Sequence, residues 1–117
     1  MMIGNKYGNK KTVIDGIKFD SQKEANRYFE LKLLLRAGQI KDLEWQPKFK
    51  ICDSIRYEGK MYRERYYIAD FMYTESGTFM KIVEDVKSPA TRKDKVYTLK
   101  KQLFLLKYSD HFIFREV

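Results

Sequence analysis

Two runs rich in aromatic and β-branched residues, 62–73 and 79–87, constrain the fold of this chain more than any other feature. Such composition is typical of β-strands that pack on at least one face. Residues 75–78 lie between the runs and contain Gly77, which can take the positive φ angle that a tight turn needs. We interpret the two runs as an antiparallel hairpin at the centre of the fold.

The segments before this hairpin predict a short hairpin and a helix. Residues 12–19 surround Asp15-Gly16, a pair that favours a tight turn. Ser21 is followed three residues later by Glu24, which is the spacing of a capping box, and Gly38 supplies a left-handed stop. A helix is therefore predicted to begin at Ser21 and to end at Gly38.

The remaining segments complete an order of hairpin, helix, three strands, helix and strand. Residues 40–55 have an extended pattern in which Pro47 indicates an edge position or a bend, and residues 56–65 contain the Glu58-Gly59 turn. After Pro89, a second helix is predicted over about residues 91–107, and residues 111–116 predict a last strand. This order predicts the α/β class. The predicted buried stripe of the second helix consists of Val96, Leu99, Leu103 and Leu106.

The length and composition indicate one compact domain over residues 12–117. The chain has 117 residues, 44% of them hydrophobic and 34% charged, which argues against disorder. Residues 1–11 have no hydrophobic period and contain Lys6, Lys10 and Lys11, so they predict a flexible basic arm. No segment has the apolar length of a membrane helix or the pattern of a secretory signal. We expect a cytoplasmic protein, in the bacterial host cytoplasm if it is phage-encoded.

The single cysteine, Cys52, and the single histidine, His111, exclude several kinds of chemistry. One cysteine cannot form an internal disulfide, and one cysteine with one histidine cannot build a zinc cage. Most histidine catalysis is excluded as well, because neither residue has an evident partner.

The charge favours a polyanionic partner such as nucleic acid. Lys and Arg number 24 against 16 Asp and Glu, giving a net charge of +8 and a pI near 9.5. The second helix is rich in lysine, and Lys100, which borders its apolar stripe, is the best single candidate for a phosphate contact. A solvated helix face is the alternative for these charges. The predicted DNA-binding residues are Lys100, Lys101, Lys93, Arg92, Lys10 and Lys11.

The central hairpin places two acids and a lysine on one face of its sheet. If Ser76-Gly77 are the two turn residues, Asp70 lies opposite Val83, and Asp85 is the diagonal neighbour of Asp70. Because side chains alternate along a strand, Asp85 and Lys87 share this face, whereas Glu84 and Val86 point to the other. Which of the neighbouring acids, Glu84 or Asp85, shares the face of Asp70 and could bind the same cation depends on this register.

Two carboxylates side by side in apolar strands repel each other unless a cation neutralises them. Oxygen ligands suit Mg²⁺, with Mn²⁺ as a second choice. Lys87 can orient or deprotonate an attacking water, or stabilise charge on a phosphate. A plain ion pair between Asp85 and Lys87 is the alternative.

Glu24 is a third candidate acid, because it points along the apolar stripe of the first helix rather than towards water. Its alternative role is a capping-box bond back to the Ser21 amide, and both roles can coexist.

The residues Ile68-Ala69-Asp70-Phe71 and, fourteen residues later, Asp85-Val86-Lys87, preceded by a helix with Glu24, resemble the PD-(D/E)XK nuclease superfamily. The likeness is greatest to its phage-encoded, Holliday junction resolvase-like members. Alanine replaces the proline of the superfamily's name at position 69. The resemblance implies a restriction-endonuclease-like core with a mixed central sheet flanked by helices. It also implies Glu24, Asp70, Asp85 and the Val86 carbonyl as metal ligands and Lys87 as the catalytic lysine.

The expected function is a Mg²⁺-dependent endodeoxyribonuclease that hydrolyses phosphodiester bonds by in-line attack of an activated water. The resemblance implies a homodimer that resolves branched, Holliday junction-like DNA in phage recombination or replication. Two alternatives remain open. One is a nuclease of the same fold that acts on nicked, flap or linear duplex DNA, and the other is a catalytically silent DNA-binding module.

Overall fold

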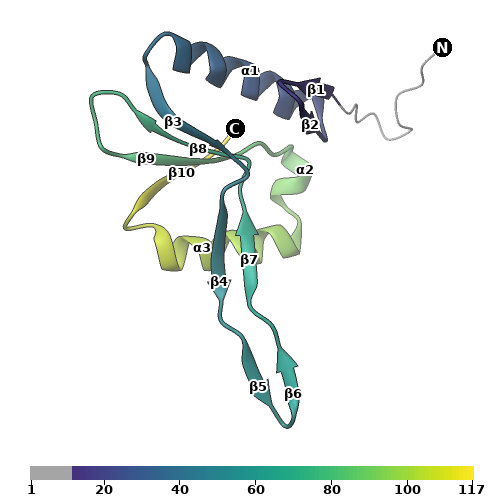
Figure 1. The fold of residues 1–117 in the computed structure, drawn as a ribbon. Helices are drawn as coiled ribbons and strands as arrows, with labels where there is room; N and C mark the ends of the chain where they lie inside the picture. Colours follow the sequence, from purple (N-terminus) through teal and green to yellow (C-terminus); the bar gives the residue numbers. More distant parts are fainter. Residues whose placement is uncertain (1–11) are drawn as a thin grey trace, which may run out of the picture.

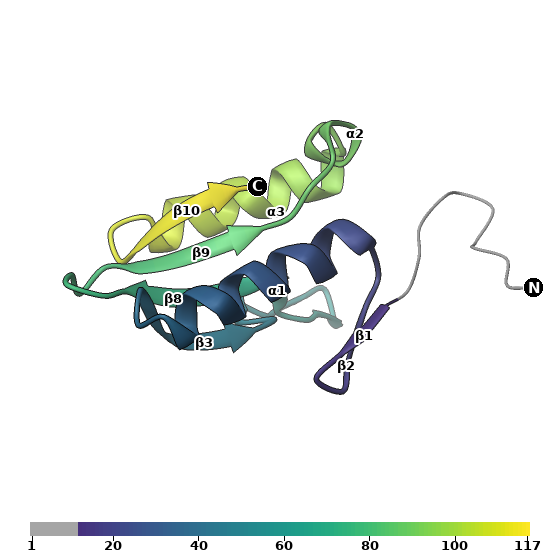
Figure 2. The same ribbon diagram turned by 90° about the horizontal axis from the view of Figure 1, so that it is seen from above.

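The computed structural model describes residues 12–117, which form a mixed four-stranded sheet with helices on both faces (Figures 1 and 2). The strand order is β10-β9-β8-β3. Strands β3 (Ile40–Trp45), β8 (Phe71–Glu75) and β9 (Lys81–Asp85) pair antiparallel, whereas β10 (Phe112–Glu116) runs parallel to β9. The β9–β10 connection is a helical crossover, as a parallel pair requires. The mixed α/β class predicted from the sequence is confirmed.

The first hairpin and first helix agree with the sequence predictions. β1 (Thr12–Ile14) and β2 (Ile17–Phe19) are joined at Asp15-Gly16. α1 (Gln22–Arg36) begins after Ser21, whose Oγ accepts the N–H of Glu24 at 3.1 Å. The backbone turns left-handed at Gly38, with φ of 77°, as a helix stop requires. α1 covers one face of the sheet through a core that contains Phe19, Ala25, Tyr28, Leu31, Ile40, Phe71, Tyr73 and Ile82.

The predicted strand over residues 62–73 is divided among three strands: the end of β6 (Lys60–Tyr62), β7 (Arg65–Ile68) and the start of β8. β6 pairs with β5 (Ile55–Tyr57), and β7 pairs with β4 (Lys48–Cys52). Strands β4, β5, β6 and β7 form an arm that extends away from the sheet (Figure 1). The chain leaves this arm at Ala69 and Asp70, where the partner of the strand changes from β4 to β3. Backbone bonds bridge the change, because Ala69 N–H donates to Pro47 O and Gln46 N–H donates to Asp70 O.

The predicted register of the central hairpin is wrong by two residues. β8 ends at Glu75 and β9 begins at Lys81, so the loop is longer than the assumed two-residue turn. Met72, not Asp70, therefore lies opposite Val83. A shift of two residues keeps every side chain on its predicted face, because strand side chains alternate with a period of two. The predicted face of Asp85 survives for this reason.

The predicted second helix is interrupted. α2 (Pro89–Arg92) is followed by its C-cap, Lys93, and α3 (Lys95–Tyr108) begins after Asp94. Asp94 Oδ2 accepts the N–H of Tyr97 at 2.9 Å, which is an N-cap bond that starts a new helix. This cap divides the single helix that the sequence predicted over about residues 91–107.

The predicted buried stripe of this helix is also wrong. α3 covers the sheet face opposite α1 (Figure 2), and it buries Tyr97 and Phe104 there. Phe104 packs against Phe49 with ring centroids 4.9 Å apart. Phe104 also packs against Tyr67 of β7, with ring centroids 5.0 Å apart. Of the predicted stripe only Leu103 is partly buried, and Val96, Leu99 and Leu106 are exposed.

No helix within residues 12–117 is long and apolar enough to cross a lipid bilayer. The predicted basic arm, with Lys10 and Lys11, lies outside the described residues.

Candidate active site

Asp70, Asp85 and Lys87 meet where β8 begins and β9 ends. The Lys87 Nζ lies 2.8 Å from Asp85 Oδ1 and 3.8 Å from Asp70 Oδ2. All three side chains are largely shielded, with exposed fractions of 14% for Asp70, 1% for Asp85 and 20% for Lys87. The structure thus brings together the two acids and the lysine that the alternation pattern placed on one face.

Backbone hydrogen bonds hold these side chains in position. Val86 N–H donates to Asp70 Oδ2 at 2.7 Å, so the carboxylate is fixed to the strand that carries Asp85. Beyond β10, Val117 N–H donates to Asp85 O at 2.9 Å, and Lys87 N–H donates to Val117 O at 3.1 Å. The parallel pairing therefore continues to Lys87 and keeps it beside the acids.

The Tyr67 hydroxyl donates a hydrogen bond to Asp85 Oδ2. Tyr67 is buried and comes from β7, on the arm, so this bond joins the base of the arm to the acidic cluster. Tyr67 belongs to the aromatic run over residues 62–73 that predicted a packed strand, and the sequence did not single it out. Nothing in its spacing distinguishes it from the other tyrosines, because the bond depends on β7 and β9 coming together.

Glu24 approaches the cluster from the first turn of α1. Burial, and then the negative charges of Asp70 and Asp20, raise the pKa of Glu24 to about 7. Its backbone N–H is capped by Ser21, as the capping box predicts. The observed bond is the half of the capping box that Ser21 supplies, whereas the Glu24 side chain interacts with Asp70.

Burial in the cluster disfavours the ionised form of its two aspartates. Burial raises the pKa of Asp85 to about 6 and also raises the pKa of Asp70, although Lys87 opposes both shifts. Burial by itself lowers the pKa of Lys87, but the hydrogen bond with Asp85 and the charge of Asp70 outweigh it and raise the pKa. Lys87 therefore contacts two carboxylates, acts on Glu24 through its charge and is held in its charged form, while the charge of Lys101 also acts on Asp85.

Glu84, the alternative to Asp85, lies on the opposite face of β9. Arg27 of α1 contacts both of its carboxylate oxygens, at 2.8 and 2.6 Å, and the Tyr73 hydroxyl donates to it as well. The structure thus resolves the choice of acid in favour of Asp85 as the member of the cluster. No pattern in the sequence pointed to Arg27 as the partner of Glu84.

A second group of polar side chains borders the cluster on α3. The Tyr97 hydroxyl donates to Glu116 Oε2 at 2.5 Å, and Lys101 Nζ lies 3.0 Å from the same oxygen. Lys87 Nζ lies 5.2 Å from the centre of the Tyr97 ring, within cation–π range. Lys101, which was predicted to contact DNA, therefore forms an ion pair with Glu116.

The other predicted phosphate contacts of the described chain are exposed. Arg92, Lys93 and Lys100 all face solvent. Burial, and then the hydrogen bond to Glu116, raise the pKa of Tyr97, and the charge of Arg92 opposes this shift. Arg92 lies at the end of α2, which follows Lys87 in the chain.

The oxygen atoms that the cluster offers are of the kind that binds a hard divalent cation. Glu24, Asp70 and Asp85 offer carboxylate oxygens, which Mg²⁺ and Mn²⁺ prefer. Three acids beside one lysine leave an excess of negative charge that a cation would offset. Within residues 12–117, however, no three Asp, Glu, His or Cys side chains already enclose a point where a metal ion would be held. Binding an ion would need Lys87 or the carboxylates to adjust.

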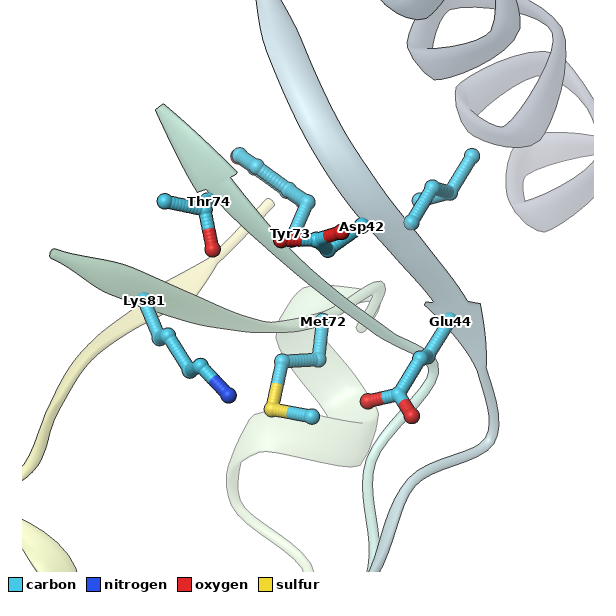
Figure 3. Close-up of a pocket in the computed structure, with 7 residues that line it drawn as sticks. Asp42, Glu44, Met72, Tyr73, Thr74 and Lys81 are labelled. Atoms are coloured by element: carbon cyan, nitrogen blue, oxygen red, sulfur yellow. The ribbon is translucent and has the colours of Figure 1, made fainter. Parts of the chain in front are cut away.

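A separate shallow pocket of about 350 Å³ lies on the sheet, between β3 and β9 (Figure 3). It contains none of the predicted catalytic residues. Its lining residues are Asp42, Leu43, Glu44, Met72, Tyr73, Thr74 and Lys81.

The fold and the cluster define a mixed α/β domain with a buried acidic and lysine centre at one end of its sheet. Residues 4–116 match the family model described as "Protein of unknown function (DUF1064)". The chain therefore belongs to the DUF1064 family, whose description assigns no activity. No curated protein and no solved structure matched the chain.

Proposed function

We propose that this protein is a metal-dependent endonuclease of the PD-(D/E)XK type with a restriction-endonuclease-like core. The observation that carries the proposal is the contact of Lys87 with both Asp70 and Asp85 on one buried face. A structural ion pair needs one acid per lysine, whereas this cluster places two carboxylates on Lys87 and a third, Glu24, beside Asp70. The surplus acids are best explained by a bound cation.

Glu24, Asp70 and Asp85 would hold Mg²⁺ or Mn²⁺, together with the Val86 carbonyl that the resemblance implies. Such an ion lowers the pKa of a water molecule and offsets negative charge on a phosphate. The Lys87 ammonium would stabilise charge on the phosphate oxygens, because Asp85 and Asp70 hold it in place at the cluster. Tyr67 and the Val86 N–H would keep the two aspartates aimed at the same point.

The net charge of +8 supports DNA as the substrate. Arg92 and Lys93 follow shortly after Lys87, on and just after α2, and are therefore the best placed of the predicted phosphate contacts. The finer assignment is a homodimer that cuts branched, Holliday junction-like DNA in phage recombination or replication. It rests on the family resemblance and on the need for two symmetric cuts.

A cleavage assay on purified protein tests this function. Labelled four-way, flap, nicked and linear DNAs are incubated with Mg²⁺, with Mn²⁺ or with EDTA. We expect metal-dependent cleavage, with paired symmetric nicks in the four-way junction. Cleavage of flaps or linear duplex alone would support a same-fold nuclease with another substrate. DNA binding without any metal-dependent cleavage would support the silent binding module and overturn the proposal.

The variant Asp70→Asn separates cleavage from binding. We expect cleavage to fall by about 10³-fold, because a metal ligand worth several kcal/mol is lost. DNA binding should be unchanged or stronger, because a negative charge near the phosphates disappears. Asp110→Asn is the matched control, because Asp110 is exposed and lies outside the cluster. A folded Asp70→Asn protein that loses binding and cleavage equally would contradict the assigned role.

A further inference from the structure

The outer face of α3 carries a row of four apolar side chains, three of which no other part of the described chain covers. Val96, Leu99 and Leu106 are 62%, 59% and 75% exposed, and Leu103 completes the row partly buried. The spacings of three, four and three residues place all four on one stripe of a helix. Tyr97 and Phe104, which pack on the sheet side, lie on a different face of the same helix.

The spacing of this row is that of the a and d positions of a coiled coil. Single exposed leucines are common on protein surfaces, but four apolar positions in continuous a/d order are the pattern of a helix–helix seam. α3 has 14 residues, which corresponds to two heptads. The row therefore fits one partner helix lying along α3.

The charges that flank the row identify the chemistry of that helix. At 100° per residue, Lys100 and Lys107 border the row on one side, and Lys95 and Gln102 border it on the other. These are the e and g positions, whose charges set partner choice in coiled coils. No acidic side chain occurs between Lys95 and Tyr108, so two positive charges on one edge and one on the other are not offset within the helix.

Two occupants from this chain itself are disfavoured by charge. A second copy of α3 would bring lysines of one seam against lysines of the other, which is repulsive. Residues 1–11 contain Lys6, Lys10 and Lys11 and no acid, so their sequence does not complement the seam either. An apolar stripe bordered by Asp or Glu complements it in both properties.

We infer that the outer face of α3, with Val96, Leu99, Leu103 and Leu106 at its centre, docks an amphipathic helix with acidic flanks from another protein. The lysines at its edges pair with the acids of that helix. This surface lies apart from the acidic cluster, so the inference does not depend on the proposed nuclease activity. It assigns Lys100 to a protein partner, whereas the sequence analysis assigned it to a phosphate.

Synthetic three-heptad peptides test the inference directly. Both peptides carry leucine at the a and d positions, and one has glutamate and the other lysine at e and g. Binding of each labelled peptide to the full chain is measured by fluorescence anisotropy at low and high salt. We expect the glutamate peptide to bind, more weakly as salt rises, and the lysine peptide not to bind. Equal binding of both peptides, or no binding of the glutamate peptide, overturns the inference.

Variants then locate the binding surface. Leu99→Ser with Leu106→Ser should weaken binding of the glutamate peptide by about tenfold or more. Phe29→Ser with Leu33→Ser on α1 is the matched control, because these residues are 55% and 47% exposed, and it should leave binding unchanged. Circular dichroism confirms that each variant is folded. Equal losses in the two variants would contradict the assigned surface.

Two further measurements test whether this face of α3 instead binds a second copy of the chain or DNA. If sedimentation shows that Leu99→Ser with Leu106→Ser dissociates an oligomer of the wild-type chain, the row is a self-interface and the inference is overturned. If the same variant or Lys100→Ala loses DNA affinity while peptide binding is unchanged, the face belongs to DNA and the inference also fails. Unchanged oligomeric state and DNA affinity, with weakened peptide binding, support it.

Discussion

Glu84 and Asp85 are neighbours in β9, and both are fully buried, yet they face opposite sides of the sheet and meet different surroundings. On the α1 side, Glu84 is held by Arg27 and the Tyr73 hydroxyl. On the α3 side, Asp85 is held by Lys87 and the Tyr67 hydroxyl. Each acid therefore has one basic and one phenolic partner, so the partners alone do not distinguish the two sites.

The difference is the balance of charge around each acid. The hydrogen bond and charge of Glu84 raise the pKa of Arg27, and burial together with Glu84 raises the pKa of Tyr73 to about 12. Glu84 and Arg27 thus form a pair with no net charge, and the exposed Glu30 is the only other acid within residues 12–117 at ion-pair distance from Arg27. Asp85 shares its lysine with Asp70, so acids outnumber bases on its side. Equal burial is therefore compatible with a structural role for Glu84 and with the proposed metal-binding role for Asp85.

The largest expected effect is on cleavage by Asp85→Asn. Loss of this carboxylate should reduce the cleavage rate by about 10³-fold or more, because metal-assisted charge stabilisation is worth several kcal/mol. Glu84→Gln, assayed in parallel as folded protein, should cleave within a few-fold of wild type. Equal losses of cleavage activity in Asp85→Asn and Glu84→Gln would contradict the different roles assigned to the two acids.

The second effect is on stability, and it falls on the other acid. Glu84→Gln should lower the free energy of unfolding by about 3 kcal/mol, because it breaks a buried pair and leaves Arg27 without its counter-charge. Urea unfolding followed by circular dichroism measures the change. Glu30→Gln is the control, because Glu30 lies 3.7 Å from Arg27 but is 61% exposed, and its loss should cost less than about 0.5 kcal/mol. Equal costs would show that Glu84 is not a structural anchor.

Divalent cations should stabilise the protein through the Asp85 face only. At an ion concentration ten times Kd, binding adds about 1.4 kcal/mol, which raises Tm by about 5 °C for a chain of this size. Thermal unfolding with Mg²⁺, Mn²⁺ or NaCl of matched ionic strength measures the shift. Asp85→Asn should lose the shift and Glu84→Gln should keep it. A shift that persists in Asp85→Asn would place the ion elsewhere.

The smallest expected effects are those of removing the hydroxyl groups of Tyr67 and Tyr73. Tyr67→Phe should lower the cleavage rate by about tenfold, because Asp85 loses an orienting hydrogen bond. Tyr73→Phe should leave the rate unchanged and lower the free energy of unfolding by about 1 to 2 kcal/mol, because the hydrogen bond to Glu84 is lost. Cleavage rates and urea unfolding of both variants are compared. An unchanged rate in Tyr67→Phe, or a reduced rate in Tyr73→Phe, would remove the distinction between the faces.

Much of the cluster follows from local sequence rules. The cap at Ser21 and the stop at Gly38 set the ends of α1, and these signals depend on neighbouring residues only. The faces of Asp85 and Lys87 follow from the two-residue period of a strand. That period is insensitive to the two-residue error in register, so the grouping of these side chains was predictable although their exact partners were not.

The predictions failed where two faces of one element compete for burial. α3 has leucines on one side and aromatic rings on another, and periodicity alone favoured the leucines. The rings face the sheet instead, where Phe104 meets Phe49. The exposed row on α3 is therefore visible only once the packing of the sheet is known.

The sequence by itself determined the mixed α/β class, the limits of α1, and the shared face of Asp85, at the end of β9, and Lys87, just after it. Caps, glycine turns and alternation act over a few residues, which is why these features need no knowledge of distant contacts. Only the tertiary structure decided that Arg27 neutralises Glu84, that Tyr67 holds Asp85, and which face of α3 is buried. These depend on how segments far apart in the chain share space and charge, because burial makes each unpaired charge costly and leaves few arrangements that satisfy all of them.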